Sequence, residues 1–474
     1  MSIWQTMTRK AHPSVYQDKD GHLVRSLRVR DFLALGVGTI VSTSIFTLPG
    51  EVAALHTGPA VVISFFLAAI VAGLVAFCYA EMSGAMPFAG SAYSWINVVF
   101  GEFFGWVAGW ALLSEYFIAV AFVGSGLSAN FRGLLKPLGF QMPAALSNPV
   151  GTDGGVVDLI SLLVIAIVAI LISFGVSRAA SVENVLVVLK VAAILLFIIV
   201  GATAIKKSNY IPFIPKYRMT ANGPFGGWQG IYAGVSMIFL SYIGFDSIAA
   251  NSAEAKDPQH TMPRGIMGSL VIAVVLFIAV SLVIIGDVHY PKYANSAEPV
   301  GLALRTTGHP VVAVIVQAIA VFGMFTALIG MTMAGSRLIY SFGRDGMLPK
   351  FLGKLDSHNR PNNALLTLTI IAILIGAFFP FAFLSQLISA GTLIAFMFVS
   401  LGMYGLRPRE GKDIPKPAFR VPFYPVLPAL AFLASLTVFL GLDKQAKIYA
   451  GCWFLLGVII YAVYGARHSA LNKE

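Results

Sequence analysis

Two ionisable residues stand inside long apolar runs and are well suited to carry a proton. Lys190 lies in VLVVLKVAAILLF and Glu115 lies in GWALLSEYFIAV, each far from the ends of its run. A charge in membrane hydrocarbon is costly, and such residues are usually functional. We therefore predict that Lys190 and Glu115 take part in proton coupling. The alternative is structural, with Lys190 bonded to helix carbonyls and Glu115 bonded to a neighbouring helix.

Two apolar segments have weakly helical middles. The segment DFLALGVGTIVSTSIFTLPG (31–50) contains Ser42-Thr43-Ser44, whose hydroxyls compete for backbone groups. The segment GVSMIFLSYIGFDSIAANSAEA (234–255) contains Ser-Tyr-Ile-Gly at 241–244, followed by Asp246, which we expect to cap a half-helix. Interrupted helices at corresponding places in two halves indicate an inverted-repeat transporter with its substrate site at the breaks. Close helix packing by small residues is the alternative.

Membrane-spanning helices must position these residues. The chain of 474 residues is 57% hydrophobic and 11% charged, with a mean hydropathy of +0.82. Soluble proteins carry about 25% charged residues. A hydrocarbon core of about 30 Å needs about 20 apolar residues per helix. We predict an all-α integral membrane protein with about twelve spans, at 31–55, 59–82, 102–128, 158–176, 184–205, 227–252, 264–286, 310–341, 363–381, 384–405, 423–441 and 447–466.

The polar segments between the spans hold nearly all of the 32 lysines and arginines, so the net charge of +11 needs no nucleic-acid partner. With the N-terminus inside, the cytoplasmic segments carry most of them, which is the bias that sets orientation. We predict a multi-pass protein with both termini in the cytoplasm. Its predicted parts are a cytoplasmic segment (1–30), a five-helix repeat (31–205), an inverted second repeat (227–405), two further helices (423–466) and a cytoplasmic tail (467–474).

The sequence gives no indication of an enzyme. No His/Cys cluster has metal-ligand spacing, and no glycine-rich phosphate loop follows a strand. Cys78 and Cys452 both lie in apolar runs, where they are expected to pack as small hydrophobes. The sequence shows no nucleotide-binding motif, so transport would draw its energy from an ion gradient or from the gradient of the substrate. We predict no cofactor and no metal, with a proton gradient as the energy source.

Four segments in order resemble the amino acid–polyamine–organocation superfamily. GVGTIVSTSIFTLPG resembles its first-helix signature, and AEMSGAMPFAGSAYSW (80–95) is similar to the segment between its second and third helices. YIGFDSIAANSAEAKDPQHTMPRGI (242–266) resembles its sixth-helix signature, and SRLIYSFGRDGMLP (336–349) resembles the end of its eighth helix. The chain looks most like bacterial members of the cationic amino acid transporter family, which implies a bacterial inner (plasma) membrane. The implied fold is the leucine-transporter fold, with two inverted five-helix repeats plus two helices.

The resemblance also implies a substrate site. The α-carboxylate of an amino acid is expected at the backbone N–H groups of Thr43, Ser44 and Ile45, at the positive start of a half-helix. Met331 is expected to form a wall of the side-chain pocket. The α-ammonium is expected at carbonyls freed by the breaks, those of Ile40, Leu240, Ser241 and Ile243.

The chain departs from the family pattern at both breaks. Many relatives have Gly-Ser/Thr-Gly where this chain has Ser42-Thr43-Ser44, so hydroxymethyl groups crowd the place of the substrate backbone. Relatives often have an aromatic lid where this chain has Leu240, beside Phe239, and these two residues are the predicted gate. The resemblance places Lys190 where sodium-coupled relatives hold a sodium ion between the first and eighth helices. A tethered ammonium could replace that ion there.

These features predict proton-coupled uptake of neutral, aliphatic or branched-chain L-amino acids by alternating access. An unpaired cationic side chain would pay heavily for desolvation in an apolar pocket. A transporter or exchanger of cationic amino acids or polyamines is the first alternative. An amino-acid-sensing receptor with a transporter fold is the alternative from another class. The expected partners are the amino-acid substrate and the lipid bilayer, and an exposed apolar patch on an outer helix could accept a small membrane accessory subunit.

Overall fold

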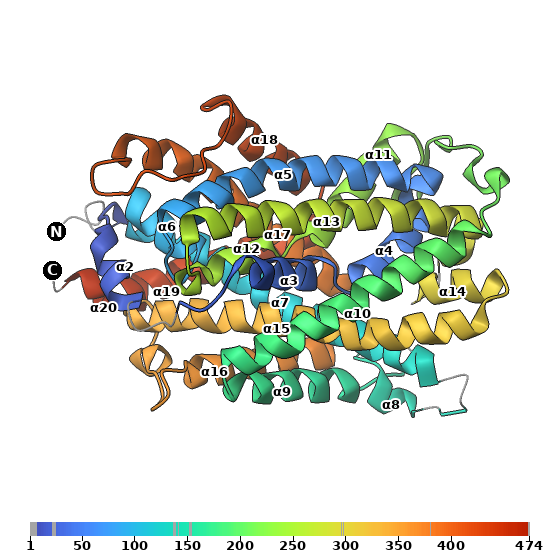
Figure 1. Ribbon diagram of the computed structural model, residues 1–474, viewed down its shortest axis with the longest axis horizontal. Coiled ribbons are helices and arrows are strands. Elements are labelled where there is room, and N and C mark those ends of the chain that lie inside the picture. The colour runs from blue at the N-terminus through green and yellow to red at the C-terminus, as the bar shows by residue number, and fades with distance from the viewer. Residues whose placement is uncertain are drawn as a thin grey trace.

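The chain forms a bundle of long helices that run along one axis, with both termini at the same end (Figure 1). The computed structural model describes residues 7–20, 25–135, 139–140, 142–150, 154–294, 296, 298–379 and 381–472. The predicted N-terminal segment (1–30) and C-terminal tail (467–474) therefore lie partly outside the described residues. Within those residues, eight helical stretches are long and apolar enough to cross a membrane, the first of which (Val29–Ala85) covers the first two predicted spans, and three shorter apolar helices accompany them.

The helices match the predicted spans, with two segments each divided into a pair of half-helices. The first span is α3 and α4, and the sixth is α11 and α12, which confirms both predicted interruptions. The short helices α2, α6, α8, α14 and α20 are additional to the predicted spans. The helices are α2 (Pro13–Asp20), α3 (Val29–Ile40), α4 (Ser44–Val52), α5 (Val61–Ala85), α6 (Ala92–Val99), α7 (Glu102–Leu135), α8 (Ala144–Ser147), α9 (Leu159–Ser173), α10 (Val176–Ala202), α11 (Gly227–Ile238), α12 (Phe245–Ala250), α13 (Pro258–Asp287), α14 (Pro299–Thr306), α15 (Pro310–Arg344), α16 (Asn362–Phe378), α17 (Phe381–Leu406), α18 (Val426–Leu440), α19 (Lys444–Ile460) and α20 (Ala466–His468).

Helix packing follows the same plan twice. The second span, α5, packs along the seventh, α13, and the third, α7, packs along the eighth, α15. The fifth span, α10, also packs on α15, and the tenth, α17, packs in the same way on α7. Two five-helix repeats related by a two-fold axis would produce this reciprocal arrangement. The exact repeat boundaries, 31–205 and 227–405, stay a prediction.

The outer helices expose apolar side chains, as a lipid-facing surface requires. Ile167 on α9, Val188 on α10, Val275 on α13 and Leu455 on α19 are each more than half exposed. Helix α7 and the parts of the two broken segments next to the breaks are buried nearly all round. A charged side chain in the middle of α7, such as that of Glu115, is therefore surrounded by protein and separated from both lipid and bulk water.

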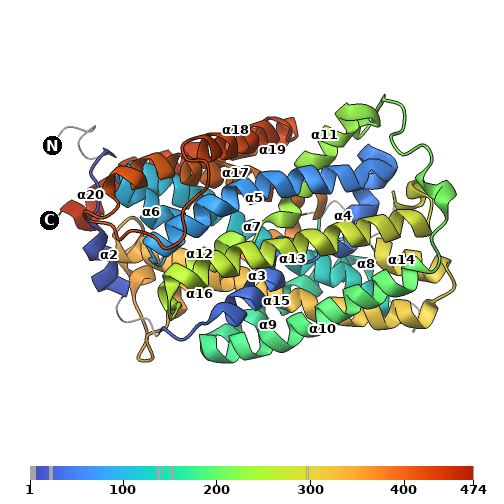
Figure 2. The ribbon, with the colours of Figure 1, turned by 45° about the horizontal axis from the view of Figure 1, so that its top comes forward.

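Figure 2 shows α2 and α20 at the end of the bundle that holds the termini, and polar contacts gather at this end. Arg9 forms an ion pair of 2.5 Å with Glu102 at the start of α7, and Ser469 near the C-terminus donates to the same carboxylate. Asp20 at the end of α2 pairs with Arg344 of α15 at 2.5 Å. At the opposite end of the bundle, β1 (Arg218–Thr220) and β2 (Gly223–Phe225) form a small antiparallel hairpin in which Arg218 lies opposite Phe225.

Candidate substrate site

The first break leaves backbone N–H groups without partners at the start of α4. Helix α3 ends at Ile40, and the N–H of Ser42 turns back to the Ile40 carbonyl at 2.9 Å. The next N–H groups, those at 43–45, have no backbone carbonyl partner in the described part of the chain. The helical pattern resumes when Phe46 donates to the Thr43 carbonyl at 3.1 Å. Unpaired amides at the start of a helix form a site for an anion.

The side chains at the first break point in different directions. The hydroxyls of Ser42 and Ser44 lie 3.5 Å apart. The Thr43 side chain points toward α7 and packs against Gly126, where a Cβ atom would come within 2.4 Å of the threonine methyl. Ile45 is buried in the core. Of the three hydroxyls at 42–44, the two serine hydroxyls therefore form the pair at the break, whereas the Thr43 side chain packs away from it.

The second break consists of a 3-10 turn and an extended residue. The 3-10 turn covers Phe239–Tyr242, Ile243 is extended, and Gly244 has a φ of +131° before α12 begins. Glycine tolerates this φ because it has no Cβ. The Leu240 carbonyl accepts a long hydrogen bond of 3.3 Å from the Ile243 N–H. The carbonyls of Ser241 and Ile243 have no backbone donor in the described residues.

The two breaks lie against each other. A Cβ atom on Gly244 would come within 3.0 Å of the Ile40 nitrogen, and the Thr39 hydroxyl lies 3.2 Å from the Gly244 carbonyl. Helix α15 closes the third side, because Gly330 packs against the Thr39 methyl. The breaks therefore place the unpaired N–H groups of α4 and the free carbonyls before α12 in one region of the bundle.

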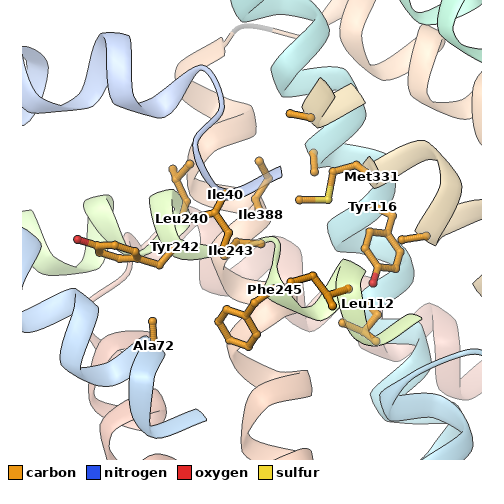
Figure 3. Packing of buried hydrophobic residues seen from close by; sticks show 14 of the residues in the cluster. Ile40, Ala72, Leu112, Tyr116, Leu240, Tyr242, Ile243, Phe245, Met331 and Ile388 are labelled. Carbon is orange, nitrogen blue, oxygen red and sulfur yellow. The ribbon is translucent and has the colours of Figure 1, made fainter. Parts of the chain in front are cut away.

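Apolar side chains surround this region. Figure 3 shows Ile40, Leu240 and Ile243 gathered at the breaks with Ile388 of α17, while Met331 comes from α15. All five are buried. The predicted gate residue Phe239 packs its ring edge-to-face on Phe396 of α17, with ring centroids 6.1 Å apart. The nine predicted substrate-binding residues thus come from α3, α4, α15 and the turn after α11, together with the residues at the two breaks.

Lys190 is fully buried and joins the first break to α15. Its ammonium donates to the Gly38 carbonyl at 2.8 Å and to the Thr326 hydroxyl at 2.8 Å. The Gly38 carbonyl lacks its usual helical donor because the N–H of Ser42 has turned back to Ile40. Gly323 leaves room for the lysine stem, since a Cβ atom there would come within 2.8 Å of it. The structure places Lys190 between the first and eighth spans, where the resemblance located it.

Glu115 is fully buried and connects to the second break. Its Oε2 accepts a hydrogen bond of 2.6 Å from the Thr392 hydroxyl of α17. The carboxyl of Asp246 interacts with that of Glu115, whose Oε1 has no hydrogen-bond donor among the described residues, and two adjacent buried carboxyls favour a proton shared between them. Asp246 in turn accepts the Gly244 N–H at 3.1 Å and the Tyr116 hydroxyl at 2.8 Å. A shared proton at this pair therefore touches the backbone of the break.

The expected contact of Asp246 with the start of α12 is present, although it is made from inside the helix and not from the residue before it. Asp246 lies inside the first turn of α12, and its carboxylate reaches back to the Gly244 N–H. Sequence reasoning missed its contact with Glu115, as well as the roles of Thr326 and Thr392. The one signal in the sequence for this contact was the position of Asp246 directly after a break. The structure shows that Asp246 is buried as deeply there as Glu115 is on α7.

The family follows from a comparison with known proteins. Residues 27–464 match the model of the family described as "Amino acid permease". The chain belongs to this amino acid permease family. The permease is accordingly a multi-pass membrane transporter of amino acids and not an enzyme, which confirms both expectations. It also confirms the superfamily resemblance.

Three relatives illustrate the range of the family. The permease is 65% identical to the branched-chain amino acid permease BcaP of Lactococcus lactis, over 97% of this chain and 98% of that protein. It is 37% identical to the methylthioribose transporter of Bacillus subtilis, over 96% of this chain and 97% of the relative. It is 34% identical to the vacuolar cationic amino acid transporter 4 of Arabidopsis thaliana, over 84% of this chain and 66% of the relative.

Proposed function

We propose that this permease takes up branched-chain L-amino acids together with protons across a bacterial plasma membrane, with both termini in the cytoplasm. The observation that carries the proposal is the meeting of two helix breaks, one with unpaired N–H groups and one with free carbonyls. Two relatives named branched-chain amino acid permeases support the choice of substrate, at 65% and 33% identity. The proton gradient supplies the energy and no cofactor takes part.

The breaks recognise the part that all amino acids share. The substrate carboxylate binds the N–H groups of Thr43, Ser44 and Ile45, where the helix end adds favourable positive potential. The serine hydroxyls at 42 and 44 stand beside this position as further donors. The ammonium group binds carbonyl oxygens across the gap, at Ile40, Leu240, Ser241 and Ile243.

The substrate side chain then meets an apolar wall. Leu240, Ile243 and Met331 present carbon atoms, and each buried methylene of the substrate contributes about 0.8 kcal/mol. Glu115 is engaged by Thr392 and Asp246, which leaves it badly placed to pair with a cationic side chain. We therefore favour branched-chain over cationic substrates, although several relatives are named cationic amino acid transporters.

Each break carries a group that can bind a proton. Lys190 holds the Gly38 carbonyl of α3, and losing a proton would weaken that charge-assisted bond. The Glu115–Asp246 pair holds Gly244 of the second break, and losing the shared proton would set two carboxylates against each other. We propose that proton binding at these groups is coupled to the opening of the site, with Phe239 and Leu240 as the gate.

Uptake into proteoliposomes tests the proposal. With an inside-alkaline pH gradient and no amino acid inside, radiolabelled isoleucine should accumulate above its outside concentration, and a protonophore should abolish the accumulation. Valine and leucine should compete, and arginine should not. Competition by arginine would favour the cationic alternative. Uptake that requires amino acid on the opposite side would show an exchanger, and binding without any uptake would show a receptor.

A further inference from the structure

A cavity lies away from the two breaks, between α7, α16, α17 and α19. It holds about 500 Å³, and its walls are almost entirely apolar. Neither the break residues nor Lys190 is among the residues that line it. The side chains that line it include Phe117, Ile375, Leu387, Ala450, Trp453 and Phe454.

The cavity opens toward the lipid-facing side of the bundle. Tyr449 and Leu456 of α19 line it and are each 46% exposed, and Cys452 between them is exposed as well. These residues lie within an apolar helix of membrane-spanning length. The molecules that reach an apolar opening at that depth are the lipids of the bilayer.

The volume of the cavity limits which molecules can occupy it. Small-molecule sites usually measure about 300–1,000 Å³. A transmembrane helix about 10 Å wide would fill about 500 Å³ in little more than one turn. The cavity is therefore too small for an accessory helix to enter along its length, whereas a flexible acyl chain fits.

Positive charge lies where the headgroup of such a lipid would be. Lys444 and Lys447 occupy the first turn of α19, and the other end of this helix leads to the C-terminus. Lys447 lies three residues before Ala450 and seven before Phe454, so it stands on the helix face that lines the cavity. The Lys447 ammonium donates one hydrogen bond to the Leu440 carbonyl at 2.9 Å. Asp443 precedes both lysines, which leaves a net positive strip.

We propose that this cavity binds one acyl chain of an anionic phospholipid whose headgroup contacts Lys444 and Lys447. The occupant would touch Ser114 of α7 and Gly391 of α17, which pack against each other in the cavity wall. The next residues in each helix, Glu115 and Thr392, share the buried hydrogen bond of 2.6 Å. The lipid thus supports the helix pair that holds Glu115.

Native mass spectrometry of the delipidated protein tests the site without relying on transport. The probes are phosphatidylglycerol and phosphatidylcholine with the same acyl chains. The protein should retain phosphatidylglycerol better, by about fivefold for each lysine that contacts the headgroup. Cys452→Trp should lose this retention because indole fills the cavity. Val275→Trp, on the exposed face of α13, is the matched control and should retain the lipid like the parent protein.

A second variant separates lost binding from lost folding. Lys444→Gln with Lys447→Gln leaves the cavity unchanged and should bring phosphatidylglycerol retention down to that of phosphatidylcholine. Melting temperatures of all variants should stay within a few degrees of the parent protein. Equal retention of the two lipids by the parent protein would overturn the proposal. Unchanged retention by Cys452→Trp, or a co-purified small membrane protein displaced by that variant, would also overturn it.

Discussion

Glu115 and Asp246 lie in a single buried cluster at the second break, and we propose that the proton they share decides how the break is held. Glu115 accepts from Thr392, and Asp246 accepts the Gly244 N–H and the Tyr116 hydroxyl. Among the described residues, neither carboxyl contacts a lysine or an arginine. Removing the shared proton would place two negative charges together in a medium of low dielectric constant, which is strongly unfavourable.

Glu115→Gln should uncouple transport from protons while leaving the site intact. Glutamine keeps an acceptor for Thr392 and can donate to Asp246, but it cannot release a proton. Accumulation of isoleucine driven by a pH gradient should fall to the level seen without a gradient, while exchange of isoleucine across the membrane continues. Glu298→Gln, which removes an ion pair with Arg305 at 2.6 Å outside the breaks, is the control and should keep accumulation. Normal accumulation by Glu115→Gln would contradict this role.

Lys190→Met tests the first break in the same assay. Methionine has a similar length but cannot donate to the Gly38 carbonyl, so a buried acceptor of α3 loses its charged partner. A hydrogen bond of a charged group contributes about 1.5–3 kcal/mol, and we expect a matching loss of thermal stability together with loss of pH-driven accumulation. Thr326→Val removes the neighbouring hydroxyl and keeps the ammonium, so accumulation should persist. Uphill uptake by Lys190→Met would exclude proton coupling through this lysine.

At the scale of elements, the second break depends on a single glycine. Gly244 combines a φ of +131° with a contact to the α3 backbone, whereas Gly223 in the hairpin has a φ of +102° with open space around it. Both Gly→Ala changes incur backbone strain of roughly 1–3 kcal/mol. Only Gly244→Ala also pushes the two breaks apart, so it should abolish isoleucine binding measured by thermal shift, and Gly223→Ala should retain it. Equal binding in both variants would show that the contact between breaks is dispensable.

The helix α2 is fixed to the bundle through Tyr16, which stacks on Phe88, and through Asp20, which pairs with Arg344. Burial raises the pKa of the Asp20 carboxyl, and the Arg344 guanidinium opposes this effect. Breaking a buried ion pair costs roughly 3 kcal/mol, so Asp20→Asn should loosen α2. Exposed Arg25 and Arg28 follow α2 along the chain, and trypsin should cut there faster in the variant. Asp413→Asn, in an ion pair with Arg409 in another loop, is the control and should leave this cleavage unchanged.

The helices could be predicted where the residue composition and the length of an apolar run determine the structure. Apolar length located the spans, and serine and glycine located both breaks to within a residue or two. The sequence could not show that Glu115 meets Asp246, because the contact joins helices distant in the chain and neither flanking pattern specifies a partner. The place of Lys190 came from a family resemblance. The lipid-facing cavity was also missed, because it arises from how α16 and α19 pack and no motif marks it.

At the scale of the whole molecule, charge divides the two ends of the bundle. The end with the termini carries most of the basic residues, including those of the loops after α15 and α17, and the other end carries the loop after α10. A cytoplasmic excess of lysine and arginine sets orientation, which predicts that the termini lie inside. The basic residues at 206–218 lie at the other end and oppose this bias. The orientation of the protein in the membrane therefore has to be measured by labelling.

Two exposed serines provide the test of orientation in whole cells. Ser208 lies in the loop after α10, and Ser357 lies in the loop after α15, at the opposite end of the bundle. With Cys452 replaced by alanine, Cys78 remains buried and gives little background. A membrane-impermeant maleimide should label Ser208→Cys in intact cells and should label Ser357→Cys only after the cells are opened. The reverse pattern would place the termini outside, so the proton-coupling groups would meet the gradient from the opposite side and inward uptake would no longer follow from the charge distribution.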